Sequence, residues 1–225
     1  MSTNSSTATA AEVLAGAAPY TRRVLAFYDL FVLGVVCPVV WGCSRNEMLQ
    51  TYDRSVGHRH LDLGPGTGFF LDRTTFPTLS PDLTLVDLNA DVLAKAGGRI
   101  ARYRPTLLQR DVLQPLGLGE RRFDSVGINF LFHCLPGSLS EKAIVFDNVL
   151  PYLAPGARIF GSTVLAHGVE HGRLAPKALQ SLNGDGTMSN LGDSLQDLDA
   201  ELSARFSRYQ LAERGSVALF DITVE

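Results

Sequence analysis

Three glycines at alternate positions, Gly64, Gly66 and Gly68, have the spacing that points most directly to chemistry in this sequence. They follow the apolar run His60–Leu63 and come just before Phe69. Because glycine adopts positive φ angles and has no side chain, such a loop between a strand and a helix lets backbone N–H groups approach a ligand. The dinucleotide fingerprint G-x-G-x-x-G needs a glycine where Phe69 stands, and the loop lacks a P-loop lysine. The spacing therefore disfavours a dinucleotide or a triphosphate, and a nucleoside with an amino-acid tail fits better.

The elements that must position this loop alternate between short apolar runs and helical patterns, which is typical of a parallel sheet covered by helices. Helices are expected over Ala90–Tyr103, with Asn89 as the cap, and over Ser140–Leu153. A hairpin around Gly215 should add an antiparallel pair at the sheet edge. The expected parallel strands are Arg59–Leu63, Leu83–Leu88, Thr106–Asp111, Asp124–Phe130 and Arg158–Thr163.

Polar residues end or closely follow the carboxyl ends of the first four strands: Asp62, Asp87, Asp111 and Asn129. In an open parallel sheet these ends share one crevice, where ligands bind. The carboxylate of Asp87 offers two acceptor oxygens for the two hydroxyls of a ribose and would repel a 2'-phosphate. Asp111 can accept from an adenine amino group while the amide of Val112 donates to a ring nitrogen. Asp62 and the glycine loop would meet the ammonium and carboxylate of the tail. Taken singly, each acid could equally be a helix cap or a solvated strand end.

Four segments then carry a family resemblance: "HLDLGPGTGFFLDR", "LTLVDLNADVLAKAGGRI", "LLQRDVLQPL" and "FDSVGINFLFHCLPG". In this order they resemble the motifs of class I S-adenosylmethionine-dependent methyltransferases, over roughly residues 59–225. The flanking segments look like a branch of bacterial and fungal enzymes that act on small molecules. The resemblance implies a Rossmann-like sheet of seven strands, S-adenosylmethionine as cofactor and S-adenosylhomocysteine as product, and it implies no particular substrate. The expected cofactor-binding residues are Tyr28, Trp41, Asp62, Gly64, Pro65, Gly66, Gly68, Asp87, Leu88, Asn89, Asp111, Val112, Asn129 and Phe130.

An apolar segment, Val24–Trp41, lies upstream and is nearly long enough to span a membrane. Asp29 inside it and Pro38 near its end disfavour a span or an export signal and favour a helix that covers the active site. Tyr28 and Trp41 could present aromatic faces to a sulfonium, and the hydroxyl of Tyr28 makes it a catalytic candidate; core packing is the alternative. The domain plan is a mobile tail at 1–18, an N-terminal helical lid at 19–57 and a methyltransferase domain at 58–225.

Two histidine patterns raise further possibilities. His133 follows the fourth strand, where a base could take a proton from an attacking oxygen or nitrogen, although a histidine packed under the loop explains it equally well. His167–His171, "HGVEH", matches a zinc-hydrolase pattern, but Gly168 makes the required helix poor, so no metal site is expected. The polar stretch Ser181–Ser194 is expected to be a mobile lid or a surface connection.

Composition limits the partners. A net charge of -3 and a pI near 5.9 give no basic surface for nucleic acid. The three cysteines are odd in number and lack metal-ligand spacing, which suggests thiols of a cytoplasmic protein. The oligomeric state stays open, with a homodimer as one option.

The sequence therefore predicts an enzyme of secondary metabolism that moves a methyl group to a small, fairly apolar metabolite by in-line displacement in a closed pocket. Three alternatives stay open. The same cofactor could assist a rearrangement or cyclisation; the fold could serve a nicotinamide oxidoreductase; or the chain could be a non-catalytic binding subunit. Formation of S-adenosylhomocysteine would distinguish methyl transfer from a rearrangement or cyclisation, and competition by NADH for the site would support the oxidoreductase.

Overall fold

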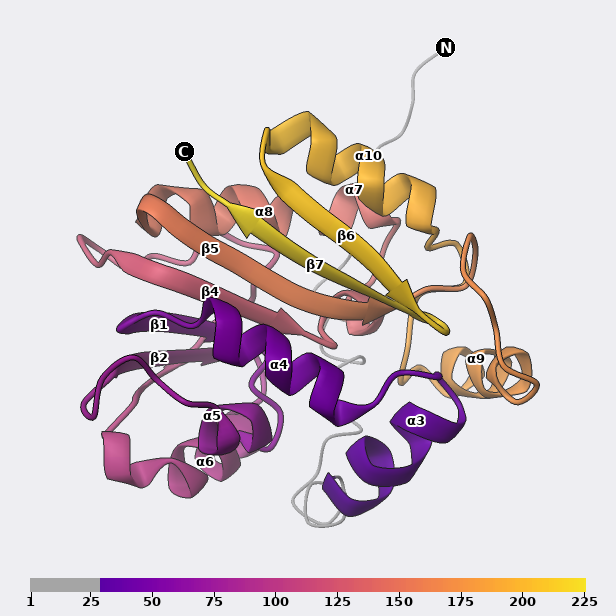
Figure 1. The fold of residues 1–225 in the computed structure, drawn as a ribbon, viewed down its shortest axis with the longest axis horizontal. Coiled ribbons are helices and arrows are strands. Elements are labelled where there is room, and N and C mark those ends of the chain that lie inside the picture. The colour runs from indigo at the N-terminus through magenta and orange to yellow at the C-terminus, as the bar shows by residue number, and fades with distance from the viewer. Residues whose placement is uncertain (1–28) are drawn as a thin grey trace.

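The computed structural model describes residues 29–225, with side chains from Leu33 onward. It contains one sheet of seven strands in the order β3-β2-β1-β4-β5-β7-β6 (Figure 1). Strands β1 to β5 pair in parallel, and β7 pairs antiparallel with both β5 and β6. The predicted seven-stranded, mostly parallel sheet with an antiparallel hairpin is confirmed. The strands are β1 (Arg59–Leu63), β2 (Asp82–Asp87), β3 (Thr106–Gln109), β4 (Phe123–Asn129), β5 (Leu153–Val164), β6 (Tyr209–Arg214) and β7 (Val217–Thr223).

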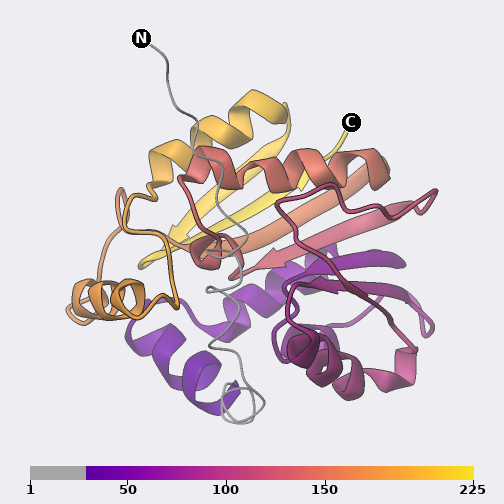
Figure 2. The same ribbon diagram turned by 180° about the vertical axis from the view of Figure 1, so that it is seen from behind.

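Helices cover both faces of the sheet, because successive strand residues point to opposite sides and both sides are apolar. On β2, for example, Leu85 packs into the apolar cluster under α4, α5 and α6, whereas Val86 packs into the cluster under α7, α8 and α10. Seen from behind, α7 and α8 cross the sheet face opposite α4 (Figure 2). The longer helices are α4 (Arg45–Ser55), α6 (Ala90–Arg99), α9 (Ala175–Gly184) and α10 (Leu195–Arg205); the shorter ones are α5 (Phe69–Arg73), α7 (Leu139–Lys142) and α8 (Ile144–Val149).

The upstream apolar segment is helical in its described part, as η1 (Asp29–Val36), a helix with a wider-than-α turn, followed by α3 (Cys37–Val39). Leu33, Cys37 and Trp41 are buried in the cluster that also contains residues of α4, α5 and α9. Within residues 29–225, none of the helices is both long and apolar enough to cross a bilayer. The predicted mobile tail at 1–18 lies outside the described residues.

Three predicted elements have other boundaries in the structure. The helix expected over Ser140–Leu153 is divided into α7, α8 and the short turn η4 (Leu150–Tyr152), which contains Pro151 near its start. The strand expected from Arg158 begins at Leu153, because Leu153 already pairs with Phe123 of β4, ahead of a shift in register that precedes the pairing of Arg158 with Ser125. The helix expected over Ala90–Tyr103 ends at Arg99, and η2 (Ala101–Tyr103) follows it.

Candidate active site

The glycine loop forms the turn from β1 into α5 and has the backbone that was predicted from its spacing. Gly64, Gly66 and Gly68 all have positive φ, between +55° and +74°. A Cβ at Gly64 would lie 3.0 Å from the Leu131 side chain, and one at Gly68 would lie 3.1 Å from the Cα of Ala96. A Cβ at Gly66 would meet nothing within 4 Å. The outer two glycines thus serve close packing, while the middle one leaves space beside the loop.

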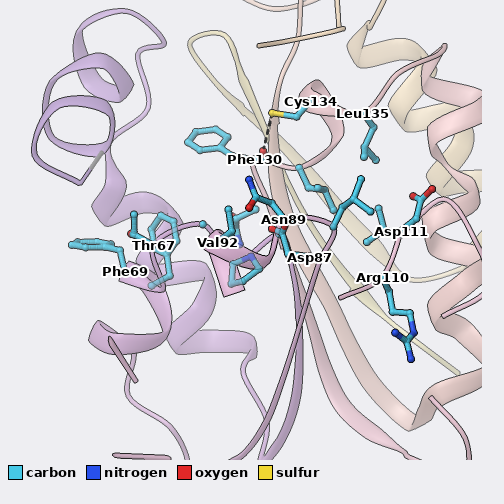
Figure 3. A pocket seen from close by; sticks show the side chains of 18 of the residues that line it. Thr67, Phe69, Asp87, Asn89, Val92, Arg110, Asp111, Phe130, Cys134 and Leu135 are labelled. Carbon is cyan, nitrogen blue, oxygen red and sulfur yellow. Dashed lines mark hydrogen bonds between the residues drawn. The ribbon is translucent and has the colours of Figure 1, made fainter. Parts of the chain in front are cut away.

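That space belongs to a pocket at the carboxyl ends of β1 to β4, whose empty volume is about 1020 Å³ when the open solvent at its mouth is included. Its walls are mostly apolar, and a few polar groups converge on it, as expected of a small-molecule site. Asp87 and Asn89 lie at its centre, Asp111 and Arg110 at one side, and Phe69 and Thr67 at the other (Figure 3). The lining residues are Leu33, Tyr52, Gly64, Pro65, Gly66, Thr67, Phe69, Phe70, Asp87, Leu88, Asn89, Val92, Arg110, Asp111, Val112, Asn129, Phe130, Leu131, Cys134, Leu135 and Pro136.

Asp87 ends β2, and its carboxylate is held by the next turn of the chain. Its Oδ1 accepts from the amide of Asn89 at 2.7 Å, while the Asn89 side chain caps α6 by accepting from the amide of Asp91 at 2.9 Å. Burial raises the pKa of Asp87 to about 6, although the backbone N–H groups of Asn89 and Leu88 act in the opposite direction. A half-buried carboxylate whose pKa is raised in this way favours a ligand that brings further hydroxyl donors to it.

Asp111 follows β3 and is oriented in the same local manner. Its Oδ1 accepts from the amide of Leu113 at 2.9 Å. The backbone of Val112 is held in turn, because its carbonyl accepts from the Nδ2 of Asn148 at 2.9 Å. Both Asp111 and Val112 line the pocket, as does Leu88 at the end of β2. The structure thus brings the residues predicted for the ribose and for the adenine to one wall.

Asp62 lies below the pocket and does not line it. It is 1% exposed, and its Oδ2 accepts from the hydroxyl of Tyr52 at 2.7 Å and lies 3.2 Å from the Nε2 of His60. The other ring nitrogen of His60 lies 2.8 Å from the hydroxyl of Ser125 on β4. Burial, followed by the charge of Asp62, raises the pKa of Tyr52 well above its usual value, so this phenol stays protonated. Tyr52, which lines the pocket, lies between Asp62 and the ligand space.

Asn129 and Phe130 end β4 and line the pocket on the side beyond the glycine loop. The Oδ1 of Asn129 accepts from the hydroxyl of Ser162 on β5 at 2.8 Å. Its Nδ2 is buried and has no hydrogen-bond partner among the described residues. Phe130 has a φ of +54°, an uncommon conformation for a residue with a bulky side chain.

The predicted residues Trp41, Gly68 and His133 lie outside the lining of the pocket. Trp41 is 2% exposed and packs in the core, where its carbonyl accepts from the amide of Ser216. His133 is buried; its Nδ1 accepts from the amide of Val164 at 3.2 Å, and its ring packs edge-on against Phe130. Burial, and secondarily the charge of Lys142, lowers the pKa of His133 to about 3. Because the Nδ1 lone pair of the neutral His133 accepts a hydrogen bond, the imidazole carries its proton on Nε2 and has no free lone pair with which to act as a base.

Tyr28, predicted for both catalysis and cofactor contact, lies outside the described residues.

The zinc-like motif "HGVEH" forms a loop after β5 and not a helix, so its two histidines are not one helical turn apart. The Nε2 of His167 lies 2.9 Å from the carbonyl of Leu191. His171 engages the Ser216 hydroxyl and the carbonyl of Ala166, both at 2.8 Å.

The stretch Ser181–Ser194 includes the end of α9 and a connection to α10, and it is more firmly held than its polar composition suggested. Asn190 and Asp193 are each 1% exposed. Asp193 forms an ion pair with Lys142 of α7 at 2.6 Å, and the same ammonium donates to the carbonyl of Ser189 at 2.6 Å. The expectation of a surface connection was therefore wrong at these two positions, which are buried.

Several lining residues were missed from the sequence, chiefly Tyr52, Phe69, Phe70 and Arg110. Tyr52 lies on α4, and the start of that helix has a recognisable sequence pattern. Ser44 and Glu47 form a capping box, with the Ser44 amide donating to Glu47 at 2.7 Å. That pattern predicts a helix after residue 44, within the segment assigned only broadly as a lid. No sequence signal shows that Tyr52 reaches Asp62.

Comparisons with known proteins agree with this geometry. A family model described as a methyltransferase domain matches residues 61–159. Demethylluteothin O-methyltransferase from Streptomyces thioluteus is 41% identical over 93% of this chain and 91% of that relative. The physcion biosynthesis cluster O-methyltransferase from Aspergillus chevalieri is 36% identical over 91% and 93% of the two chains. The N-methyltransferase vrtF from Penicillium aethiopicum is 35% identical over 80% and 76%.

Solved structures show the same fold. The complex of DhpI with SAH matches with a TM-score of 0.66 at 18% identity, covering 96% of this chain and 98% of that one. The N-methyltransferase NodS from Bradyrhizobium japonicum WM9, solved with S-adenosyl-L-homocysteine, matches with a TM-score of 0.58 at 14% identity, covering 80% and 85%.

Proposed function

The chain belongs to the S-adenosylmethionine-dependent methyltransferases that act on small molecules, and from this premise we propose that its acceptor is a hydroxyl oxygen on an apolar, aromatic compound. The observation that carries the proposal is the pocket, which joins the carboxylates of Asp87 and Asp111 to an aromatic wall containing Phe70 and Phe130. Two relatives named as O-methyltransferases support oxygen as the acceptor atom.

The residues present fit the cofactor. Asp87 is a half-buried carboxylate with an elevated pKa, and hydroxyl donors of a ribose would stabilise its ionised form. The open space at Gly66 lets a tail pass close to the backbone. We propose that Gly64, Pro65, Gly66, Asp87, Leu88, Asn89, Asp111 and Val112 make these contacts. When bound, S-adenosylmethionine supplies an electrophilic methyl group on a positively charged sulfur.

The protein then has to align the acceptor and exclude water. Leu33 of η1 lines the pocket, which supports a lid role for the segment 19–57 that precedes the domain at 58–225. Tyr28, on the same segment, remains a candidate for contact with the sulfonium. We place the enzyme in the cytoplasm, without nucleic acid or membrane as partner. Its buried cysteines are compatible with that compartment, because burial raises the pKa values of Cys37 and Cys43 to about 12 and both stay protonated thiols.

The first test is calorimetric titration with S-adenosylmethionine, followed by a screen for S-adenosylhomocysteine formation. Mono- and dihydroxylated naphthalenes and anthraquinones are suitable acceptors, with the corresponding arylamines as the matched set. Turnover of the hydroxyl compounds alone supports the proposal. Turnover of the amines alone assigns nitrogen as the acceptor, and conversion of a compound without S-adenosylhomocysteine formation indicates a rearrangement instead.

A further inference from the structure

Asn129 carries a buried polar group that the protein leaves unsatisfied. Among the described residues, its Nδ2 is the single buried side-chain nitrogen or oxygen atom without a hydrogen-bond partner. Such a group costs about 1–3 kcal/mol of stability, so its presence needs an explanation. The Oδ1 of the same amide accepts from the hydroxyl of Ser162, which is fully buried. Because Ser162 holds the oxygen, the nitrogen is the end left free.

Besides Ser162, Tyr52 is the one neighbour that interacts with this amide among the described residues. The Tyr52 hydroxyl donates to Asp62 at 2.7 Å, which fixes its hydrogen. Burial and Asp62 raise the pKa of Tyr52, and a hydrogen bond from the side chain of Asn129 counteracts part of that rise. Even with one N–H directed to Tyr52, the second N–H has no acceptor, and Asn129, 7% exposed, lines the pocket.

The strand order places Asn129 on the side of the pocket away from the proposed adenine contacts. The proposed adenine and ribose contacts lie at the ends of β3 and β2, and the glycine loop follows β1. The next strand in this order is β4, so Asn129 lies beyond the loop that would hold the amino-acid tail. The following residue, Phe130, has the strained φ of +54° and also lines the pocket. Strain and an unsatisfied polar group at adjacent positions are typical of a functional site.

We propose that Asn129 is the residue that positions the acceptor, with its free Nδ2–H donating to the oxygen of an ionised phenolic hydroxyl. The inference rests on the proposed hydroxyl acceptor. The phenol first loses its proton to water. A carbon–oxygen bond then forms as the carbon–sulfur bond breaks, and the electron pair of that bond goes to sulfur. A neutral amide donor stabilises the phenolate and directs a lone pair of its oxygen toward the methyl group. A carboxylate in the same place would repel the phenolate.

The test compares Asn129→Ala and Asn129→Asp with the wild-type chain, using the hydroxylated naphthalenes and anthraquinones as probes. Loss of one donor to a charged oxygen should lower kcat by about 10²-fold. The pH profile of kcat in Asn129→Ala should shift to higher pH, because the phenolate is less stabilised. Asn129→Asp keeps the bond to Ser162 and should be slower than Asn129→Ala. The Kd for S-adenosylmethionine should stay within about twofold in Asn129→Ala.

Stability separates a positioning role from a structural one. The double variant Asn129→Leu with Ser162→Ala replaces both partners by apolar groups, so its Tm should equal or exceed that of the wild type while turnover is lost. A Tm several degrees lower in the double variant would contradict the inference, because it would show that the amide serves packing.

The remaining outcomes are distinct. If the wild type methylates no hydroxyl compound, the proposed function fails and the inference fails with it. If the wild type is active and Asn129→Ala matches it in kcat and pH profile, only the inference fails. If Asn129→Ala weakens S-adenosylmethionine binding tenfold with acceptor KM unchanged, the amide belongs to the cofactor and the inference is wrong.

Discussion

The two halves of the pocket are built in different ways. In the half that we propose holds the cofactor, each key carboxylate is oriented by an amide two residues further along the chain: Asp87 by Asn89 and Asp111 by Leu113. In the half that we propose holds the acceptor, and in the packing behind it, polar groups find partners far away in sequence. Asn129 and Ser162 are 33 residues apart, and Lys142 and Asp193, which lie behind His133 and do not line the pocket, are 51 apart.

This difference separates what one element can do alone from what the packed fold must supply. A carboxylate that accepts from an amide in its own turn is oriented wherever that strand end forms. The cofactor half therefore depends mainly on local geometry. The packing behind Asn129 and His133 forms only when β5 and the chain segment between α9 and α10 are in place. Variants should therefore damage the two halves separately.

Breaking the buried ion pair between Lys142 and Asp193 should have the largest effect. Lys142→Met leaves the Asp193 carboxylate buried without its cation and should reduce the free energy of unfolding by about 3–5 kcal/mol. Chemical denaturation measures this loss. Adding Asp193→Asn removes the stranded charge and should restore at least half of it. In folded Lys142→Met, the Kd for S-adenosylmethionine should change little; a large increase would mean that the halves are not independent.

Removing the carboxylate of Asp87 should act on the cofactor half alone. Asp87→Ala deletes a charged hydrogen-bond acceptor and should weaken S-adenosylmethionine binding by about 1.5–3 kcal/mol, a factor of ten or more in Kd. The matched control is Asp82→Ala, an exposed acid at the opposite end of the same strand, which should bind like the wild type. Equal binding by both variants in calorimetry would remove Asp87 from the proposed contacts.

The pH dependence of cofactor binding tests the assignment of Asp87 as a cofactor contact in a second way. The pKa of Asp87 is raised to about 6, so the free protein gains a proton there as the pH falls through 6. A ribose needs the ionised form as acceptor; affinity should therefore be full at pH 7.5 and about tenfold weaker at pH 5. In Asp87→Asn the same titration should be flat. An equally steep fall in Asp87→Asn would place the titrating group elsewhere.

The same division explains what could be predicted from the sequence. The sheet and the Asp87 and Asp111 strand ends follow from patterns that repeat within a few residues, and the boundaries of β1 came out as predicted. The family resemblance added the number of strands. The role of Asp62 could not be predicted this way, because its partner Tyr52 lies on a helix whose approach depends on tertiary packing. Likewise, Asn190 and Asp193 were expected in a solvated loop, because composition does not reveal that Lys142 is buried opposite them.

His133 gives the smallest expected effect and tests the sequence interpretation most directly. It was predicted as a base, yet its Nδ1 accepts from the Val164 amide and its pKa is lowered to about 3 by burial. His133→Asn can keep an acceptor near the position of Nδ1, so kcat should fall only a few-fold. The pH profile between 5 and 8 should also keep its shape, because a group that stays neutral there adds no inflection. A general base contributes about 10²–10⁴-fold, so a loss of that size in a folded His133→Asn enzyme would restore the catalytic assignment. With a few-fold loss, proton removal belongs to the solvent, which agrees with an acceptor that reacts as its phenolate beside Asn129.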